Sequence, residues 1–199
     1  MDVFDGEQDR LLYLELINKH TSRCGVQIFA WCLMTNHVHF LAVPEEVSSL
    51  ARAFGEAHRL YTRMKNFRMD ARGYLFQGRF NSCVLDEKHL IAAARYIEQN
   101  PVRAKMVKKP GDYKWSSAPF HLGLVHSDPL VMDRTLMGLV GNWSELLEGG
   151  DEDANRDLRS GVSIGRPMGD DRFMERVQEM TGRNLRKGRP GRAAKSGES

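Results

Sequence analysis

The spacing of apolar and polar positions predicts a chain that begins with a helix and continues into two strands. Residues 7–19 place leucine and isoleucine at three- and four-residue intervals between charged residues, which is the period of an amphipathic helix. Residues 25–34 and 37–43 are rich in β-branched and aromatic side chains, which favours strands. Asn36 suits the short turn between them, and Pro44 ends the second run. We therefore expect a β-hairpin.

The next part of the chain predicts two helices with a third strand between them. Residues 46–66 and 87–99 carry apolar residues at helical intervals. Asp86 suits the cap of the second helix, which should end before Pro101 because the residue preceding a proline disfavours the α region. We interpret residues 73–86 as the third strand. The order of these elements predicts an α+β fold with few strands.

The chain changes character after residue 121. Residues 128–148 predict one or two short helices, and residues 170–185 predict a short amphipathic helix. An acidic, glycine-containing stretch, residues 148–157, separates them. The last segment is basic and rich in glycine and proline, which is typical of a mobile arm. The expected organisation is a first domain at 1–121, a helical C-terminal extension at 122–182 and a basic flexible tail at 183–199.

Composition and charge narrow the class of protein. The 199-residue chain is 41% hydrophobic and 28% charged with a formal charge of +3, which is ordinary for a globular protein. We find no secretory signal and no apolar run long enough to cross a bilayer, so we expect a cytoplasmic protein with no membrane partner. Cys24, Cys32 and Cys83 form no Cys-x-x-Cys pair, which favours reduced thiols over a disulfide framework or zinc site.

Two histidines interrupt the second predicted strand. His37 and His39 are two positions apart, so their side chains share one face of a strand while Val38 points to the other. Two imidazoles on one face can bind a divalent ion if a third ligand arrives from elsewhere. A surface or structural pair is the more common explanation of an isolated His-x-His. A histidine-triad nucleotide hydrolase is disfavoured, because the next residue on that face is Leu41.

The helix predicted at residues 87–99 offers a partner for this pair. Tyr96 and Asn100 are four positions apart and would share one side of a helix. A phenol hydroxyl and an amide oxygen could then reach the same site. Spacing alone favours a simpler explanation, in which Tyr96 is an aromatic residue at the core edge and Asn100 caps the helix end.

Four segments of the chain follow one another in a specific order. They are CLMTNHVHFLAVP, GYLFQGRFNS, ARYIEQNPVRAKMV and DYKWSS. Together they resemble the one-tyrosine HUH transposases and, more narrowly, the REP-associated tyrosine transposases of bacteria. The resemblance runs from about residue 4 to residue 121. The segment that begins SIGRPMGDDRFMERV also resembles the C-terminal extension of some of these proteins.

The resemblance implies a fold, a site and a reaction. The fold is a ferredoxin-like antiparallel sheet with helices on one face. His37 and His39 would bind a divalent metal, Mg²⁺ or Mn²⁺, with Asn100 as a third ligand. Tyr96 would attack single-stranded DNA, commonly at the foot of a hairpin, to form a 5′-phosphotyrosine link that a second strand then resolves. The resemblance leaves open whether the protein is a monomer or a homodimer. Rival candidates for the nucleophile are Tyr61, Tyr74 and Tyr113, but none of them lies in the matching motif.

Basic side chains are candidates for contacts with the DNA backbone. They are Arg59, Arg63 and Lys65 on the helix at residues 46–66 and Arg79 on the third strand. A solvated basic helix face explains the first three equally well. The arm from Arg183 to Lys195 would add affinity that is independent of DNA sequence.

The match departs from the family at its beginning. Relatives usually start with a strand before the first helix, and this chain starts at MDVFDGEQDR, in the following loop. In a ferredoxin-like sheet that strand lies beside the one carrying the histidines, which would leave an edge unpaired. Three explanations compete: the true start lies upstream, another segment or a partner chain fills the slot, or the copy is degenerate. A misplaced start or a degenerate copy is favoured over a replacement. The two expectations are therefore an active transposase and a relative that only binds DNA.

Overall fold

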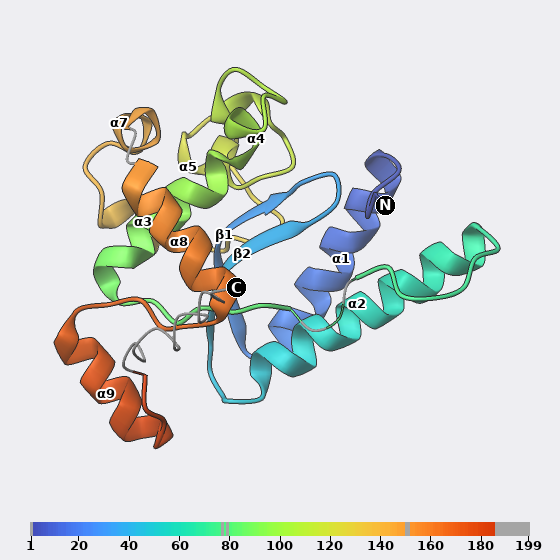
Figure 1. The fold of residues 1–199 in the computed structure, drawn as a ribbon. Coiled ribbons are helices and arrows are strands. Elements are labelled where there is room, and N and C mark those ends of the chain that lie inside the picture. Colours follow the sequence, from blue (N-terminus) through green and yellow to red (C-terminus); the bar gives the residue numbers. More distant parts are fainter. Residues whose placement is uncertain (1, 77, 79, 150–151, 186–199) are drawn as a thin grey trace, which may run out of the picture.

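The chain folds into an α+β structure, which confirms the class predicted from the sequence (Figure 1). The computed structural model describes residues 2–76, 78, 80–149 and 152–185. Two strands, β1 (Val26–Leu33) and β2 (Val38–Pro44), form one antiparallel hairpin. The helices of the described residues are α1 (Glu7–Arg23), α2 (Ser49–Arg68), α3 (Glu87–Glu98), α4 (Asn100–Arg103), α5 (Ala118–His121), α6 (Thr135–Gly138), α7 (Trp143–Glu148), α8 (Glu152–Ile164) and α9 (Asp171–Thr181). None of these helices is long and apolar enough to span a bilayer.

The register of the hairpin fixes where the histidines lie. Cys32 of β1 lies opposite His39 of β2, and the ladder is irregular between Ile28 and Ala30. An extra residue at such a bulge shifts the alternation by one, so Ile28 and Trp31 both contribute to the same core. The predicted hairpin is confirmed.

Helices cover both faces of the hairpin, whereas the resemblance implied helices on one face. In Figure 1, α1 and α2 lie on one side of the strands and α3 lies on the other. The first core joins α1 and α2 to Ile28 and Trp31, and the second joins α3 to Ala30 and Cys32. The physical reason is that β1 carries apolar side chains on both faces, so each face needs a cover that excludes water.

The third strand predicted at residues 73–86 is wrong. The described residues of that segment follow an irregular path, with one isolated bridge from Leu85 to Met168. Gly73 and Gly78 have φ angles of 113° and 109°, which an extended strand does not allow. Two phenylalanines of the segment pack on α2 instead: the Phe76 ring stacks on His58 with centroids 4.1 Å apart, and the Phe80 ring centroid lies 5.6 Å from that of Phe54.

The DYKWSS segment takes up the outer edge of β1. The backbone N–H of Leu33 donates to the carbonyl of Trp115 at 2.9 Å, and that of Ser117 donates to the carbonyl of Trp31 at 3.0 Å. Cys32 and Ser116 thereby form an isolated antiparallel bridge. The edge of β1 is therefore partly paired by a segment more than eighty residues later, which satisfies backbone groups that would otherwise be buried without partners.

The C-terminal helices share a core with the hairpin. Leu136, Trp143 and Leu147 pack in the same cluster as Ala30 and Cys32. The short helices predicted at residues 128–148 and the helix predicted at 170–185 are confirmed as α6, α7 and α9. The domain boundary at residue 121 stays a prediction. The basic tail from residue 186 onward lies outside the described residues.

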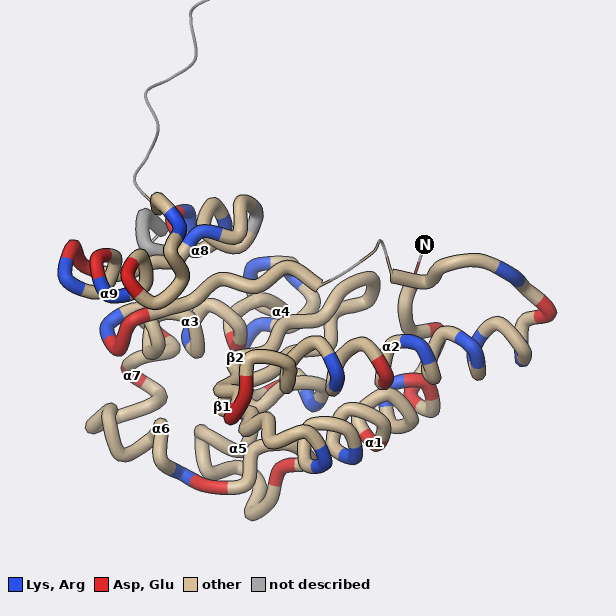
Figure 2. The backbone as a smooth tube through the Cα atoms, turned by 90° about the horizontal axis from the view of Figure 1, so that it is seen from below, with Lys and Arg blue, Asp and Glu red and all other residues tan. Residues whose placement is uncertain are grey.

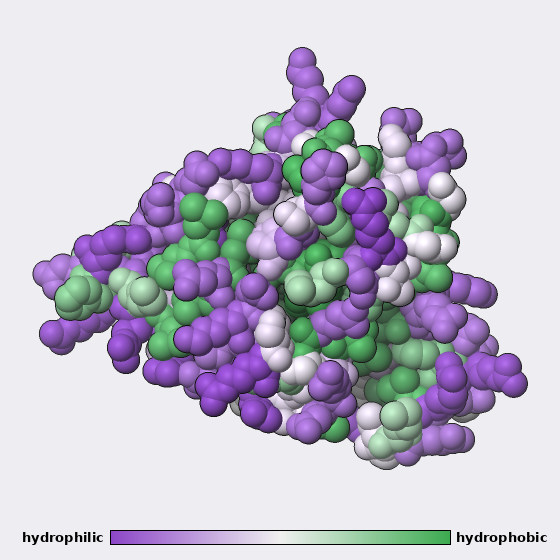
Figure 3. All heavy atoms as spheres, turned by 180° about the vertical axis from the view of Figure 1, so that it is seen from behind, coloured by the Kyte–Doolittle hydropathy of each residue, from purple (hydrophilic) through white to green (hydrophobic). Residues whose placement is uncertain are grey.

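Some apolar side chains remain exposed on the surface (Figure 3). Phe67, at the end of α2, and Tyr74, in the loop that follows, are among the most exposed. They flank a hydrogen bond from Asn66 Nδ2 to the carbonyl of Gly73, 2.9 Å long. On the face that Figure 3 shows, apolar side chains are interspersed with hydrophilic ones, which is ordinary for a protein surface.

Candidate functional site

The two histidines of the predicted pair lie side by side. Their ring centroids are 4.8 Å apart and their planes are nearly perpendicular, at 89°. Val38, between them, packs into the first core with α1 and α2. His37 and His39 therefore share the face of the hairpin that α3 covers, as the alternation of a strand predicts.

One nitrogen on each histidine is suited to a metal ion. His37 Nδ1 donates to Asn36 Oδ1 at 2.7 Å, which leaves the Nε2 lone pair available. His39 Nε2 is buried and finds no hydrogen-bond partner among the described residues. Buried polar atoms normally have partners, so this orphaned nitrogen fits a cation that would supply the missing one. The sequence patterns did not single out Asn36 as a residue that orients His37. Its position next to His37 in the chain was the signal that could have indicated this role.

Partial removal from water favours the neutral form of both imidazoles. Desolvation lowers the pKa of His37. Desolvation, followed by the charges of His37 and Arg103, lowers the pKa of His39 to about 3. A neutral imidazole is the form that binds metals, so protons do not compete for this pair near neutral pH.

Tyr96 lies beside this pair. Its ring centroid is 5.9 Å from that of His39, with the planes at 87°. Helix α3 begins where Asp86 accepts a hydrogen bond from the backbone of His89 at 2.9 Å, as predicted, and packs on the hairpin through small residues such as Ala94. The structure thus brings together the tyrosine and the histidines that the sequence singled out.

The other candidate tyrosines have different surroundings. The hydroxyl of Tyr61 donates to the carbonyl of Val3 at 2.8 Å, and that of Tyr113 donates to the carbonyl of Leu33 at 2.7 Å. Burial raises the pKa of both phenols. Tyr74 is 95% exposed in the loop after α2. Both buried hydroxyls are engaged in structural hydrogen bonds, which leaves Tyr96 as the tyrosine next to the histidine pair.

Asn100 is turned toward the end of its helix. Its Nδ2 donates to the carbonyl of Ile97 at 3.3 Å, and its Oδ1 accepts from Arg103 at 2.8 Å. The oxygen that would bind a metal therefore accepts a hydrogen bond from Arg103 in this conformation, and the Nδ2 contact with Ile97 agrees with a cap at the helix end. Within the described residues, no group of three or more His, Cys, Asp or Glu side chains could hold a metal. Metal binding by His37 and His39, with Asn100 as a third ligand, therefore stays a prediction.

Arg103 joins the parts of the site and was missed in the sequence. Its guanidinium carbon lies 4.1 Å from the centroid of the Tyr96 ring. It donates both to the carbonyl of Tyr96 and to Asn100 Oδ1, each at 2.8 Å. Arg103 lies two helical turns after Tyr96, and this spacing was the sequence signal that could have indicated their contact. Arg159 of α8 lies farther out, 6.0 Å from the ring centroid, and no pattern in the sequence indicated it.

The prediction that Lys65 contacts DNA is wrong, because its ammonium group is buried inside the protein. The side chain is 1% exposed, and Nζ donates to the carbonyl of Val3 at 2.8 Å. It also forms ion pairs with Asp5 at 2.9 Å and Asp9 at 3.7 Å. These acceptors neutralise a charge that would otherwise be costly to bury.

The other DNA-binding candidates differ from one another. Arg59 and Arg63 are exposed on α2, and Arg59 pairs with Glu56 at 2.7 Å. Arg79 lies outside the described residues. Figure 2 shows lysines and arginines spaced along α2 and recurring at α8 and α9, with acidic residues among them. A contact with DNA stays a prediction for Arg59 and Arg63.

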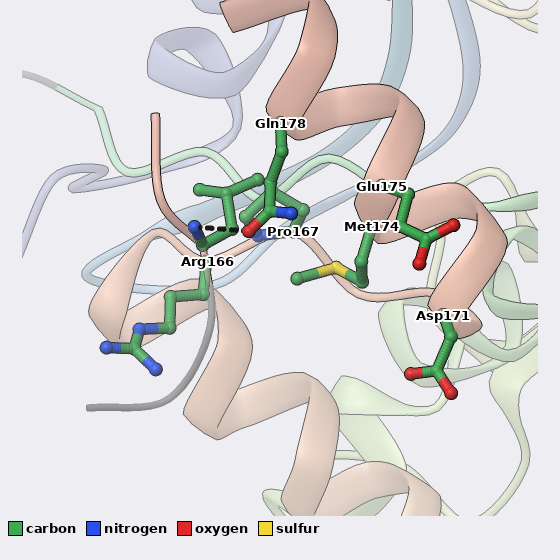
Figure 4. Close-up of a pocket in the computed structure, with 7 residues that line it drawn as sticks. Arg166, Pro167, Asp171, Met174, Glu175 and Gln178 are labelled. Atoms are coloured by element: carbon green, nitrogen blue, oxygen red, sulfur yellow. Dashed lines mark hydrogen bonds between the residues drawn. The ribbon is translucent and has the colours of Figure 1, made fainter. Parts of the chain in front are cut away.

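A separate pocket lies at α9, away from these residues in the sequence. It is lined by Arg166, Asp171, Glu175 and Gln178, among others (Figure 4). Gln178 Oε1 accepts a hydrogen bond from the backbone of Leu185 at 2.9 Å. None of the histidines or tyrosines of the candidate site lines this pocket, so we assign the pocket no part in it.

Comparison with known proteins gives one finding. A family model described as "Transposase IS200 like" matches residues 1–100, just over half of the 199-residue chain. The matched segment contains the histidine pair, Tyr96 and Asn100. Neither the curated proteins nor the solved structures gave a match.

Proposed function

Because the chain belongs to the family of IS200-like transposases, we propose that it is a single-stranded DNA transposase of the REP-associated tyrosine type. It cleaves and rejoins DNA through a covalent link to Tyr96. The observation that carries the proposal is the position of the Tyr96 ring, 5.9 Å from His39 at the end of a histidine pair. Both parts of the site come from one chain, which supports catalysis without a residue from a second copy. A homodimer is therefore a proposal that the site does not require.

His37 and His39 would hold the divalent cation, Mg²⁺ or Mn²⁺. The orphaned Nε2 of His39 and the Asn36 contact of His37 support these ligands. When bound, such a cation supplies Lewis-acid polarisation of the scissile phosphate. The remaining coordination positions would be filled by water and phosphate oxygens, unless Asn100 exchanges its bond with Arg103 for the cation.

Tyr96 forms a new bond from its phenol oxygen to phosphorus, and the bond from phosphorus to the 3′ oxygen breaks. The phenol loses its proton during the attack, and the leaving oxygen gains one to become a 3′ hydroxyl. The guanidinium of Arg103, 4.1 Å from the ring centroid, favours the negative charge that develops on the phenol oxygen. A 3′ hydroxyl of another strand then reverses the same exchange, which rejoins DNA without ATP.

The proposed substrate is single-stranded DNA that contains a hairpin. The exposed guanidinium groups of Arg59 and Arg63 would contact its phosphates, and such contacts weaken with added salt. A DNA substrate of this kind fits a cytoplasmic location.

A labelled single-stranded hairpin tests the proposal. With Mn²⁺, the wild type should form a covalent protein–DNA adduct that survives denaturing electrophoresis, and Tyr96→Phe should form none. Tyr74→Phe is the matched control, because Tyr74 is exposed and away from the histidines, and it should react like wild type. An absent adduct, or an equal yield from Tyr96→Phe, would rule out the proposed reaction.

One observation favours a second candidate function, DNA binding without cleavage. The amide oxygen of Asn100 accepts from Arg103, so His37 and His39 alone would be left to hold a cation in this conformation. A protein of this kind would shift the hairpin in a native gel and yield no adduct with either Mg²⁺ or Mn²⁺.

A further inference from the structure

A carboxylate is buried in the tyrosine helix, two residues after Tyr96. Glu98 is 0% exposed, and nothing in the proposed reaction uses it. A charged carboxylate is costly to remove from water unless several donors compensate it. Its burial in this helix therefore calls for a physical reason.

Three side chains from outside the helix converge on this carboxylate. Glu98 Oε1 accepts from the hydroxyl of Ser117 at 2.6 Å and from Nδ1 of His121. Glu98 Oε2 accepts from the indole N–H of Trp143 at 2.8 Å. All three donors are buried. Charge-assisted hydrogen bonds of this kind are strong and directional, so they fix the carboxylate in three dimensions.

Ser117 continues the connection to the histidine hairpin. Its hydroxyl accepts from the backbone N–H of Trp31 at 3.0 Å, and its own N–H donates to the carbonyl of Trp31 at 3.0 Å. Trp31 lies in β1 next to Cys32, which is opposite His39 in the ladder. Hydrogen bonds thus connect the tyrosine helix through Ser117 to β1, the strand that pairs with the one carrying His39.

The apolar packing of α3 alone holds the helix less specifically. The buried apolar α3 residues of this core are Ala93, Ala94 and Ile97, and the two alanines have small side chains that interlock little with the hairpin. Glu98 is about 200° around the helix from Tyr96, at 100° per residue. A contact that fixes Glu98 on one side therefore also sets where Tyr96 points on the other.

We propose that Glu98 is a positioning residue, which holds the tyrosine helix so that the Tyr96 hydroxyl faces the histidine pair. Ser117 and Trp143 donate hydrogen bonds to Glu98, so residues beyond position 100 influence the reaction by fixing the position of α3. This inference rests on the proposed role of Tyr96 as the nucleophile. It gives the DYKWSS segment and α7 a function in catalysis, although neither touches the reacting atoms.

Variants of the full-length chain test the positioning role. Ser117→Ala removes the hydroxyl between Glu98 and β1, and Glu98→Met keeps the length of the side chain without its hydrogen bonds. Each should lower the single-turnover rate of adduct formation by about 10- to 100-fold, because a nucleophile displaced by about 1 Å reacts that much more slowly. The Kd for the hairpin should change less than about twofold. Glu98→Gln, which can still exchange hydrogen bonds, should retain most of the rate.

A control separates positioning from stability. Tyr61→Phe removes the buried hydrogen bond to Val3 on the opposite face, so it should lower the melting temperature and leave the rate unchanged. Hydrogen exchange of the α3 amides gives a readout that does not depend on activity: they should exchange faster in Ser117→Ala, while those of α1 keep their protection. If Glu98→Met does not fold, Ser117→Ala carries the test alone.

Two results would overturn the proposal. One is a wild-type rate and unchanged α3 exchange in Ser117→Ala. The other is an equal loss of rate in Ser117→Ala and Tyr61→Phe at equal loss of stability. If the wild type itself forms no adduct, the proposed function fails, and the exchange of α3 still decides whether Glu98 fixes the helix.

Discussion

At the scale of single residues, Asn36 and Arg103 orient the His37 and Tyr96 side chains that the proposed reaction needs. Asn36 holds Nδ1 of His37, and Arg103 lies over the ring of Tyr96 while it binds the carbonyl of the same residue. Neither residue is an expected ligand or nucleophile. The site therefore depends on supporting side chains as much as on the motif itself.

Asn36→Ala tests this support. Without the amide oxygen, the His37 ring loses its fixed tautomer and orientation, so Mn²⁺ affinity should fall by about tenfold, as for other residues that support a metal ligand. Isothermal titration of the full-length protein with Mn²⁺ measures the change. Asn66→Ala is the control, because Asn66 bonds to Gly73 in the loop after α2 and should leave the affinity unchanged. Equal affinity in Asn36→Ala and wild type would contradict the assigned role.

The sequence predicts residues whose signal is local and misses those whose partners are distant. Strand alternation predicts that His37 and His39 share a face, and the structure agrees. The local pattern predicted that Lys65 would be a surface cation. It gave no sign of burial, because the acceptor Asp5 lies 60 residues earlier in the chain. Arg103 follows Tyr96 by seven residues, a spacing that indicates a shared helix side, but its contact with the ring also depends on the turn between α3 and α4.

At the scale of elements, the hairpin and the helices were predictable and the third strand was not. The helices and strands that formed have clear periods of apolar residues and a partner face on which to pack. Residues 73–86 also contain apolar and aromatic residues, but Gly73 and Gly78 adopt positive φ angles. In place of strand pairing, Phe76 packs on His58 of α2. A local sequence pattern does not predict such a tertiary contact.

A buried ion pair connects α1 and α2 and predicts a loss of stability when it is broken. Asp9 of α1 bonds to Arg68 and lies 3.7 Å from the ammonium of Lys65, both on α2. Asp9→Asn should lower the free energy of unfolding at pH 7 by about 3 kcal/mol, since it removes one partner of a buried charge. Urea denaturation measures this. Glu56→Gln, which breaks an exposed pair, should cause no measurable change.

The effect of Asp9 should depend on pH in a defined direction. Burial acts to raise the pKa of Asp9, but hydrogen bonds from Asp5 and Arg68 and the charges of Arg68 and Lys65 outweigh it, so the pKa is lowered. A carboxylate with a lowered folded-state pKa contributes stability above its usual pKa and loses it as the pH falls through the lowered value. Wild type and Asp9→Asn should therefore differ at neutral pH and converge in strong acid. A difference that is independent of pH would contradict this account.

At the scale of the whole molecule, the C-terminal extension belongs to the second core. Leu136, Trp143 and Leu158 pack in the cluster that α3 forms with the hairpin. The sequence suggested an appended part, because its composition changes after residue 121. The side chains of this part nevertheless pack in the same cluster as the hairpin, and the domain boundary at residue 121 stays a prediction.

Two truncations should therefore behave differently. A chain that ends at residue 121 loses the apolar side chains of α6, α7 and α8 and should no longer unfold cooperatively. A chain that ends at residue 185 keeps the described structure and loses the basic tail. It should keep its melting temperature and bind the hairpin more weakly, with a smaller dependence on salt, because fewer phosphates are neutralised. Cooperative unfolding of the shorter chain, or an unchanged salt dependence of the longer one, would be the contrary result.

The chemical identity of the protein–DNA link tests the central claim most directly. The full-length protein is incubated with Mn²⁺ and a single-stranded hairpin, the adduct is digested, and the modified peptide is sequenced by mass spectrometry. We expect a nucleotide joined through its 5′ phosphate to Tyr96, with a 3′ hydroxyl on the released strand. A link on another tyrosine, a 3′ phosphate linkage or the absence of any modified peptide would contradict the account.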